Sequence, residues 1–451
     1  MNAAKEFRKL FSSPSIKHVY NTKILGTRSI GLDKVNSRNF EEKLDEECEH
    51  ICQKVLSSKY KFTKFKEKLL LKGAGKFPRQ ISIPTIRDRL TLKILCDFIF
   101  DIFPDAKPNL PQDKISDLNN SINSGKFKYY IKIDLQDFYP SIDHNLLIKK
   151  LRRKIRIVEF KNLIESAITN PTVPETNTKQ GKYQSKGVAQ GLSISNVLAE
   201  VFMLDVDASL RSLAPVCIRY VDDILLLTDD DPGPVLDSAL RILKKHKLNP
   251  HRPGTADSKT IAGNLSEGVS FLGYQLSPQK ISVKPGNILS FESSIVTVFS
   301  EYKHRLRNCK NEADKKTALA RFRWALNLKI TGCIYKNQRF GWIFYYSQIN
   351  EISILKRIDN TINKLFDRFK IPTPPYPKKM QKSFFESKRR DKKTHKYIIN
   401  YDNLTDDTKI KLLSEIGFDI KGLNASEVSA KFHKLIRRAT RKLEKDISSI
   451  S

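Results

Sequence analysis

The sequence predicts an α+β fold, and three observations carry this prediction. Residues 219–227 are apolar on both sides of two adjacent carboxylates, a pattern typical of two short strands joined by a tight turn. Residues 130–134 form a second apolar, strand-like run that ends on another carboxylate. After Pro285, apolar residues recur at helical spacing. Strands and helices are therefore expected in the first part of the chain, and mainly helices in the rest.

The chain is long and strongly basic. Its 451 residues could hold roughly two to four modules, and 81 Lys and Arg against 49 Asp and Glu give a net charge of +32. This charge is too large and too widely spread for one solvated face, so it indicates a polyanionic partner, above all nucleic acid. No apolar run approaches the roughly 20 residues that span a bilayer. With six scattered cysteines, the expectation is a cytoplasmic protein without a membrane partner.

Asp222 and Asp223 occupy the centre of the predicted strand-turn-strand at residues 219–227. Neighbouring residues of a strand face opposite ways, so a turn is the natural means of bringing adjacent carboxylates towards one spot, where they could hold a metal ion. The alternative is a solvent-exposed acidic turn, which is the interpretation we give to Asp229–Asp231 before Pro232. Between apolar strands, however, an unpaired charge is costly.

A partner carboxylate lies upstream. The strand at residues 130–134 ends on Asp134, and Phe138-Tyr139-Pro140 predicts a turn. A basic amphipathic helix is then expected from Asp143 to about Arg156.

A third element completes the pattern: Gln190 and Gly191 lie in a loop that leads into an apolar helix near residues 197–204. Together the three elements resemble motifs A, B and C of reverse transcriptases. Motif A is matched by Asp134 with its aromatic pair four and five residues on, motif B by Gln190-Gly191 with Ser195, and motif C by residues 220–223.

The resemblance covers roughly residues 20 to 370. Residues 79–89 are similar to the fingers hairpin of group II intron and related bacterial enzymes, residues 257–260 to motif D, and residues 270–274 to motif E. Ala189 and Asn196 stand where proline is common in the family. In these departures the chain most resembles the stand-alone, defence-associated reverse transcriptases of bacteria.

This resemblance implies a right-hand polymerase with fingers, a palm built on an antiparallel sheet, a helical thumb, and a basic, mainly helical C-terminal extension. The expected domains are an N-terminal helical segment at 1–60, fingers and palm at 61–285, the thumb at 286–372 and an RNA-binding extension at 373–451.

The resemblance also implies the catalytic machinery of an RNA-directed DNA polymerase. Asp134 and Asp222 are expected to bridge two Mg²⁺ ions, which Mn²⁺ can replace, with Asp223 as a weaker or indirect ligand. The backbone carbonyl of Leu135 would supply a further oxygen. Carboxylates on neighbouring strands are the hard oxygen ligands that such ions require.

The same resemblance assigns Tyr139, Gln190, Gly191 and Lys259 to the nucleotide. Tyr139 would pack under the incoming sugar and exclude a 2′-hydroxyl; the alternative is a tyrosine of the core. Gln190 and Gly191 would let the backbone approach the templating base and the nucleotide closely. Lys259 would donate a proton to pyrophosphate or simply contact a phosphate.

Residues 64–89 carry cations among glycines on a predicted β-hairpin. Such a hairpin could fold over a triphosphate, and the resemblance makes Arg79 the first candidate contact and Lys76 the next. Arg87 and Arg89 are predicted to bind nucleic acid. The alternative for all four is generic binding to a phosphate backbone.

Beyond Pro372, a proline-rich break precedes a predicted flexible, cationic arm at residues 378–396. The arm and the final helix are expected to hold a specific structured RNA, or else to act as a non-specific electrostatic tail. Asn424 and Glu427 are predicted to form a capping pair for that helix. The candidate nucleic-acid contacts are Lys388, Arg389 and Arg390, and the candidate stacking residues are Phe384, Phe385 and Tyr397.

The predicted function is therefore reverse transcription, with an associated non-coding RNA as template, deoxynucleoside triphosphates as substrates, a DNA product and a role in antiviral defence against phage. A companion protein or a second copy of the chain is a further candidate partner. The alternatives are an RNA-dependent RNA polymerase, against which Tyr139 argues, and an inactive polymerase-derived RNA-binding protein, against which the three acids argue.

Overall fold

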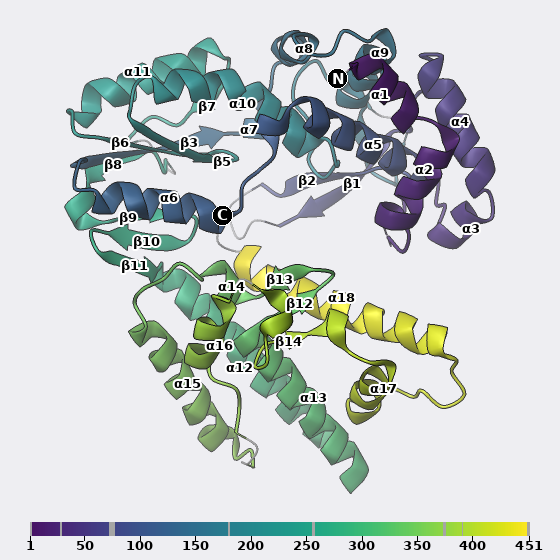
Figure 1. Cartoon of the computed structure of the whole chain (residues 1–451), viewed down its shortest axis with the longest axis vertical. Helices are drawn as coiled ribbons and strands as arrows, with labels where there is room; N and C mark the ends of the chain where they lie inside the picture. Colours follow the sequence, from purple (N-terminus) through teal and green to yellow (C-terminus); the bar gives the residue numbers. More distant parts are fainter. Residues whose placement is uncertain are drawn as a thin grey trace. The chain divides into compact units, whose positions relative to one another are not determined.

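The computed structural model describes residues 2–27, 29–71, 77–178, 181–254, 258–372, 376–389 and 391–448. They divide into two compact units (Figure 1). Unit 1 comprises Met1–Asn109 and Lys128–Gly263, and unit 2 comprises Leu110–Phe127 and Asn264–Ser451. Both units combine helices with small sheets, which confirms the predicted α+β class.

Unit 1 begins with helices, as expected for residues 1–60. Their apolar faces pack on the long helix α5 and bury Phe7, Phe11 and Tyr20 completely. Helix α5 begins after Thr85, whose side-chain oxygen accepts a hydrogen bond from the amide of Asp88, an N-cap that ends the preceding strand. The bounds are α1 Ala3–Leu10, α2 Ser13–Val19, α3 Ser37–Glu41, α4 Leu44–Leu56 and α5 Ile86–Ile102.

The predicted fingers hairpin is present. Strands β1 (Phe65–Leu70) and β2 (Arg79–Ile83) pair antiparallel, and β4 (Thr172–Val173) pairs parallel with β1. The expectation that Arg87 and Arg89 belong to this hairpin is wrong, because both lie in α5.

The palm sheet has the strand order β5-β6-β3-β7, with β8 paired to β3. Its β5–β6, β6–β3 and β3–β7 pairs are antiparallel, as predicted. Helices α10 and α11 lie together on one face of the sheet (Figure 1). The bounds are β3 Tyr129–Gln136, α10 Ser195–Arg211, β5 Val216–Tyr220, β6 Asp223–Thr228, α11 Pro232–Lys245, β7 Asn249–Pro250 and β8 Ile261–Asn264.

Three helices lie between β3 and β4. The short helix α7 (Phe138–Ser141) occupies the predicted turn, and α8 (His144–Arg152) begins as expected after Asp143, whose side chain caps it. The expectation of one helix to Arg156 is wrong, since α8 ends four residues earlier and α9 (Val158–Thr169) follows.

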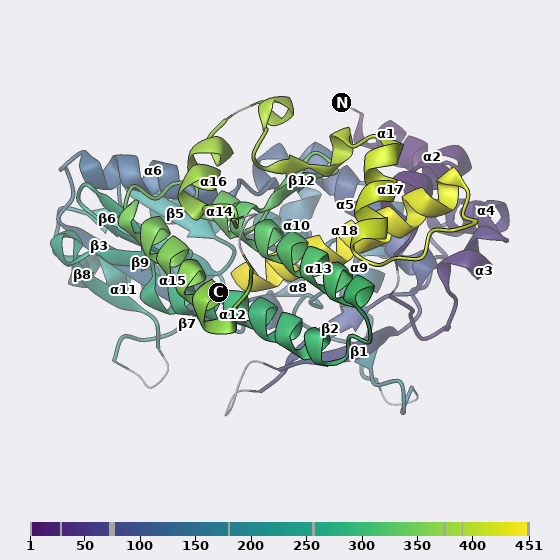
Figure 2. The same ribbon diagram turned by 90° about the horizontal axis from the view of Figure 1, so that it is seen from below.

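Unit 2 joins α6 and a three-stranded sheet to a set of long helices. Helix α12 packs against both α13 and α15 (Figure 2). The ring of Phe299 in α12 lies 5.0 Å from that of Phe322 in α13 and 5.3 Å from that of Phe366 in α15. The bounds are α6 Pro111–Asn123, β9 Val269–Phe271, β10 Tyr274–Ser277, β11 Lys280–Val283, α12 Pro285–Arg307, α13 Glu312–Thr331 and α15 Ser353–Phe369.

The residues after 376 belong to the same compact unit. Strand β14 pairs parallel with β12, and one apolar cluster contains both Tyr335 of β12 and Phe432 of α18. The predicted capping pair is confirmed: Asn424 accepts from the amide of Glu427 at 2.9 Å, and Glu427 accepts from the amide of Asn424 at 3.0 Å. The bounds are β12 Cys333–Tyr335, β13 Gln338–Phe340, α14 Trp342–Tyr345, α16 Met380–Ser387, β14 Ile399–Asn400, α17 Asp406–Glu415 and α18 Ala425–Ser448.

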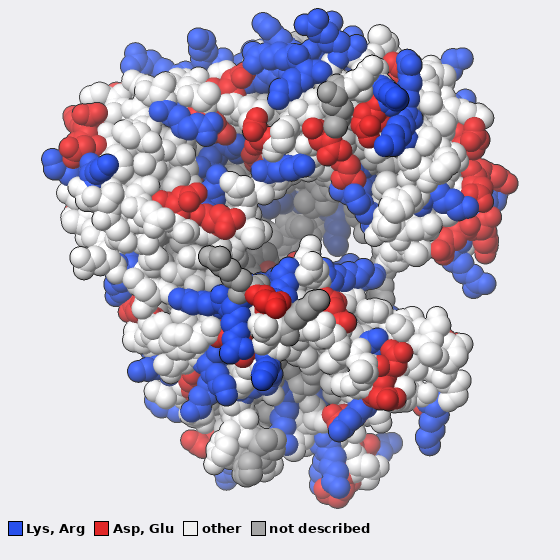
Figure 3. Space-filling model, in the orientation of Figure 1, with Lys and Arg blue, Asp and Glu red and all other residues white. Residues whose placement is uncertain are grey.

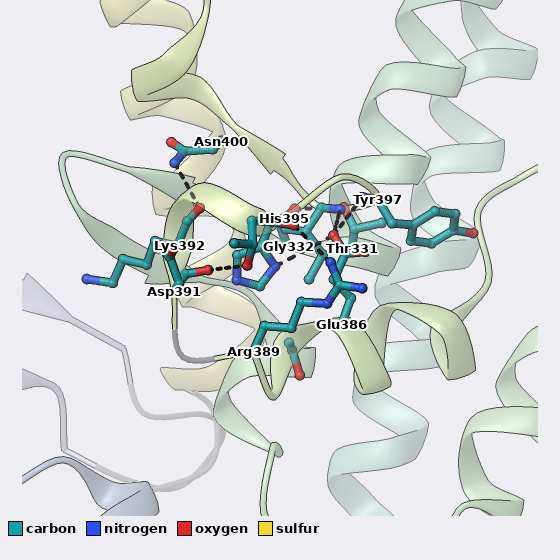
Figure 4. Close-up of polar contacts among 12 residues, drawn as sticks. Thr331, Gly332, Glu386, Arg389, Asp391, Lys392, His395, Tyr397 and Asn400 are labelled. Carbon is teal, nitrogen blue, oxygen red and sulfur yellow. Dashed lines mark hydrogen bonds and ion pairs between the residues drawn. The ribbon is translucent and has the colours of Figure 1, made fainter.

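The expectation of a flexible arm at residues 378–396 is wrong for the part that the structure describes. Its cations bind backbone carbonyls: Lys378 donates to Tyr397, Arg389 to Thr394 at 2.9 Å, and Lys392 to Asn337 at 2.6 Å. Figure 4 shows how Arg389, Lys392 and Tyr397 lie in this contact network. Such bonds hold the segment in one fold.

The aromatic residues of this segment differ in exposure. Phe384 is fully buried, so the expectation that it stacks on bases is wrong. Phe385 is 56% exposed and remains available for such a contact. None of the helices described here is both long and apolar enough to cross a membrane.

Candidate active site

The palm hairpin brings the predicted carboxylates together. Asp134 in β3 lies directly opposite Asp223, the first residue of β6. Directly opposed residues of antiparallel strands share one face of the sheet. Tyr220 also pairs with Asp223, so Val221 and Asp222 form a two-residue turn with Asp222 at its tip. The structure thus places all three predicted acids at one end of the β3–β6 pair.

The turn contains a backbone outlier. Val221 has φ of +58°, a left-handed conformation that costs a β-branched residue roughly 1–3 kcal/mol. The guanidinium of Arg219 donates to the Val221 carbonyl at 2.9 Å. This contact fixes the peptide that precedes Asp222.

Arg219 is itself held by two acids of α10. It binds Glu200 at 2.6 Å and Asp207 at 2.7 Å. Burial alone would lower the pKa of Arg219, but hydrogen bonds to Asp207 and Glu200 raise it above its usual value. The cation therefore stays charged and connects α10, the helix after the Gln190-Gly191 loop, to the acidic turn.

The acids at this turn repel one another. Asp222 is accessible to solvent at the tip, yet the protein atoms around it raise its pKa by burial, and Asp223 and Asp134 raise it further. Burial also raises the pKa of Asp223, while Lys132 opposes the shift. A group of carboxylates that destabilise each other's charge is stabilised by a bound cation.

Sequence reasoning missed three neighbours of these acids. Lys132 lies 3.8 Å from Asp223, and His251 lies 3.4 Å from the carboxylate of Asp134. The backbone amide of Asp134 donates to the hydroxyl of Thr260 at 3.1 Å. Lys132 could have been found, since it is two residues before Asp134 and strand residues so spaced share a face. No local pattern marks His251, and Thr260 lies in the segment similar to motif D but was given no contact with Asp134 there.

The donor set fits magnesium in one of its usual modes. Among the described residues, no three His, Cys, Asp or Glu side chains form a complete metal cage. Mg²⁺ is commonly bound by one or two carboxylates together with substrate phosphates and water, and so needs no such cage. Asp134 and Asp222 can supply these oxygens. The predicted role of the Leu135 carbonyl stays a prediction; Leu135 lies in β3 and pairs with Pro250.

Tyr139 lies in α7 close to the acids. Burial raises the pKa of its hydroxyl to about 12, and Asp222 contributes to this shift. The hydroxyl donates to Asn196 of α10 at 3.4 Å. This bond connects the ring of Tyr139, which belongs to motif A, to the helix that contains Asn196.

The predicted phosphate contacts are only partly described. Arg79, the first residue of β2, is exposed and near enough to Asp222 and Tyr139 to lower the pKa of both. Lys259 lowers the pKa of Asp223. Lys76 and the motif D residue Asp257 lie outside the described residues.

Gly191 has a structural reason to be glycine. Its φ is +99°, and a Cβ there would lie 2.6 Å from the side chain of Ile81 and 3.0 Å from the carbonyl of Ser82, both in β2. The carbonyl of Gln190 also accepts from the amide of Ser82 at 2.7 Å. The loop therefore packs on the hairpin, and its predicted approach to the nucleotide stays a prediction.

The remaining predicted contacts are engaged within the protein. Arg87 forms a two-bond ion pair with Glu47, and Arg89 donates to the carbonyl of Pro84 at 3.1 Å. Lys388 lies 4.4 Å from the ring centre of Phe384. Arg389 binds a backbone carbonyl, as described above, and Arg390 lies outside the described residues. Their binding to nucleic acid stays a prediction.

Comparison with known proteins points to one family. Residues 66–276 match the family described as reverse transcriptase (RNA-dependent DNA polymerase). Protein YkfC of Escherichia coli (strain K12) is 23% identical over 200 residues, which cover 41% of this chain and 51% of YkfC. An uncharacterized 91 kDa protein in the cob intron of Schizosaccharomyces pombe is 28% identical over 170 residues, which cover 36% of this chain and 21% of that protein.

Apo telomerase from Candida tropicalis, truncated from its C-terminal domain, superposes with a TM-score of 0.38 at 16% identity over 49% of this chain and 55% of that one. The chain spans about half the length of YkfC and about a fifth of the yeast intron protein. The family match contains Asp134, Asp222 and Asp223 together with the hairpin and the loop before α10. Residues 66–276 are therefore a reverse transcriptase domain.

Proposed function

We propose that this chain is an RNA-directed DNA polymerase. The observation that carries the proposal is the placement of Asp134 opposite Asp223, with Asp222 on the turn between β5 and β6, inside the reverse transcriptase domain. Reverse transcriptases generally use divalent metal ions. We propose Mg²⁺, two ions in number, with Mn²⁺ as a functional substitute.

Asp134 and Asp222 would hold the ions, which when bound lower the pKa of the primer hydroxyl and offset charge on the leaving pyrophosphate. Asp223 has Lys132 at 3.8 Å, so part of its charge is already balanced. This contact supports the weaker, indirect role of Asp223. Arg219 holds the turn so that Asp222 is oriented before any ligand arrives.

The residues around the acids suit an incoming deoxynucleotide. Arg79, at the start of β2, is a cation near Asp222 that can bind a triphosphate. Tyr139 is held by Asn196 and by its own burial, so its ring offers a fixed wall against a 2′-hydroxyl. Lys259, near Asp223, would contact or protonate pyrophosphate.

The biological role is proposed on the resemblance alone. Ala189 and Asn196 depart from the common motif B pattern towards that of stand-alone, defence-associated enzymes. We therefore propose a cytoplasmic enzyme that copies a structured non-coding RNA during antiviral defence. Sequencing the nucleic acid that copurifies with the chain, before and after addition of deoxynucleotides, tests this role directly.

The activity itself is tested by extension of a DNA primer on an RNA template. The proposal expects incorporation of deoxynucleotides that requires Mg²⁺ and the RNA template. Preferred incorporation of ribonucleotides would support an RNA-dependent RNA polymerase instead. RNA binding without incorporation of either would support an inactive, polymerase-derived binding protein.

A further inference from the structure

A basic groove lies between α8 and α9 in unit 1, and nothing in the polymerase chemistry above uses it. Two adjoining cavities, each about 400 Å³ in volume, open along these helices. Lys149, Arg152 and Lys161 line both cavities, and Arg156 lines one. Glu165 is the one acid among the lining residues, and it lies 3.6 Å from Lys161.

The cations of this region fall into two classes. Four are engaged within the protein: Lys150 donates to the carbonyl of Phe202, Arg153 binds Asp205 at 2.9 Å, Lys154 lies 5.0 Å from the ring centre of Phe103, and Lys161 lies 3.6 Å from Glu165. The other class is Lys149, Arg152 and Arg156, which are exposed and have no ion-pair partner among the described residues.

Three unpaired cations along one groove repel one another, and this repulsion is relieved by a ligand that carries several negative charges along its length. Figure 3 shows Lys and Arg side chains gathered over α8, at the top of the view. Val158, which lines the same groove and is 66% exposed, offers an apolar contact of the kind that a ribose or base can use. A phosphodiester strand combines these features.

We propose that the α8–α9 groove binds the phosphate backbone of the template RNA outside the catalytic centre. The choice of RNA rests on the proposed function, because the template is the polyanion that the polymerase must hold before any DNA exists. The three cations of the second class are exposed and have no ion-pair partner among the described residues. In residues 378–396, by contrast, Lys378, Arg389 and Lys392 are bound to backbone carbonyls.

The test compares two triple variants of the full chain with equal loss of charge. The groove variant is Lys149→Gln/Arg152→Gln/Arg156→Gln. The control variant is Lys43→Gln/Lys54→Gln/Lys59→Gln, which removes three exposed lysines at and near α4 in the same unit. Exposed substitutions of this kind change folding stability by within about 0.5 kcal/mol, and thermal unfolding verifies that both variants are folded.

The measurement is binding of a fluorescein-labelled single-stranded RNA, and of DNA with the same sequence, over a range of salt concentrations without nucleotides or metal. Each lost phosphate contact should reduce the slope of log K against log salt by about 0.7 for a single strand, so the groove variant should lose about 2. The control should keep the wild-type slope. Hydrogen exchange of α8 and α9 should slow when RNA binds to the wild type.

Three results would overturn the inference: an unchanged slope in the groove variant, an equal loss in the control, or a greater loss for DNA than for RNA. Binding of an acidic protein to the groove in the absence of RNA would also overturn it, because the partner would then be a protein. Failure of the proposed polymerase activity is distinguishable, because the wild type would then bind RNA through the groove yet extend no primer.

Discussion

Tyr139 is the residue from which the most direct consequence for substrate choice follows. We expect Tyr139→Ala to lower the ratio of kcat/KM for a deoxynucleotide over its ribonucleotide by between about 10- and 200-fold, since the proposed wall against the 2′-hydroxyl is removed. Tyr139→Phe is the matched control, because it keeps the ring and loses only the 3.4 Å hydrogen bond to Asn196. An unchanged ratio in Tyr139→Ala would place the selecting contact elsewhere.

Asp88 is a buried acid outside the residues assigned to catalysis. Its titration should make the free energy of unfolding depend on pH. It is 1% exposed, accepts hydrogen bonds from Tyr60 and Thr85 at 2.8 Å, and burial raises its pKa from 3.8 to about 6. Between these pH values the folded state binds more protons than the unfolded state, so the free energy of unfolding falls as pH rises.

The difference in the pKa of Asp88 corresponds to about 3 kcal/mol of stability between about pH 4 and pH 7. We expect Asp88→Asn, which cannot titrate, to show no such fall in the free energy of unfolding. Hydrogen exchange of the α5 amides at several pH values, corrected for intrinsic rates, measures the local free energy of unfolding. Parallel pH profiles for the wild type and Asp88→Asn would contradict the assignment.

The sequence predicted that the three acids lie close together, because each stands at or next to the end of an apolar strand. It did not predict His251 or Thr260, since their contacts with Asp134 arise only when distant segments fold against β3. It assigned Arg87 to nucleic acid from its charge, which stays a prediction, and it did not predict the ion pair of Arg87 with Glu47, a residue 40 positions away.

Among the elements, the link between α10 and the acidic turn has the clearest mechanical role. Arg219→Met should lower the free energy of unfolding by about 3–5 kcal/mol, because Glu200 and Asp207 would be left buried without a counter-charge. Primer extension should fall as well, since the Val221 carbonyl would lose its donor.

A triple variant separates these two effects. Arg219→Met/Glu200→Leu/Asp207→Leu removes all three charges, so stability should recover, as is common when a buried ion group is replaced by apolar residues. The kcat for primer extension should stay low with KM for the nucleotide nearly unchanged. Recovery of kcat to the wild-type value would show that Arg219 acts on stability alone.

Element boundaries were predicted less well than element types. The helix expected to reach Arg156 ends at Arg152. Basic residues continue beyond Arg152, and the spacing of apolar residues does not mark the end of the helix. The hairpin was predicted from its turn residues, but it ends at Ile83, where Pro84 and the Thr85 cap begin α5.

At the scale of the whole molecule, unit 2 does not end with its long helices. Tyr401 accepts a hydrogen bond from the indole of Trp324 at 2.9 Å, and Leu328 of α13 shares an apolar cluster with Phe432 of α18. Truncation after Pro372 should therefore unfold part of unit 2. Both tryptophans lie in unit 2, so their emission should shift to longer wavelength; unshifted emission would contradict this view.

The sequence predicted the broad class because local periodicity and turn residues record which segments are strands and which are helices. It could not predict that residues 376–448 share a core with α13 and β12, since the parallel pairing of β14 with β12 joins residues 66 positions apart, such as Cys333 and Ile399, and leaves no local signal. The proline-rich break and dense charge favoured a separate arm instead.

The central claim is that Asp134, Asp222 and Asp223 form the metal-binding centre of a polymerase. Asp222→Asn tests it most directly, because the change keeps the shape of the side chain, and the repulsion from its two neighbours predicts no loss of stability. Asp229→Asn, at an acid that pairs with Lys128 beyond the hairpin, is the control.

The measurement is Mg²⁺-dependent extension of a DNA primer on an RNA template, with RNA binding followed in parallel. Loss of Asp222 as the proposed bridging ligand should cost several kcal/mol of transition-state stabilisation, so kcat/KM should fall by roughly 10³-fold or more while RNA binding stays near the wild-type value. Asp229→Asn should be fully active. Full extension by Asp222→Asn would contradict the account.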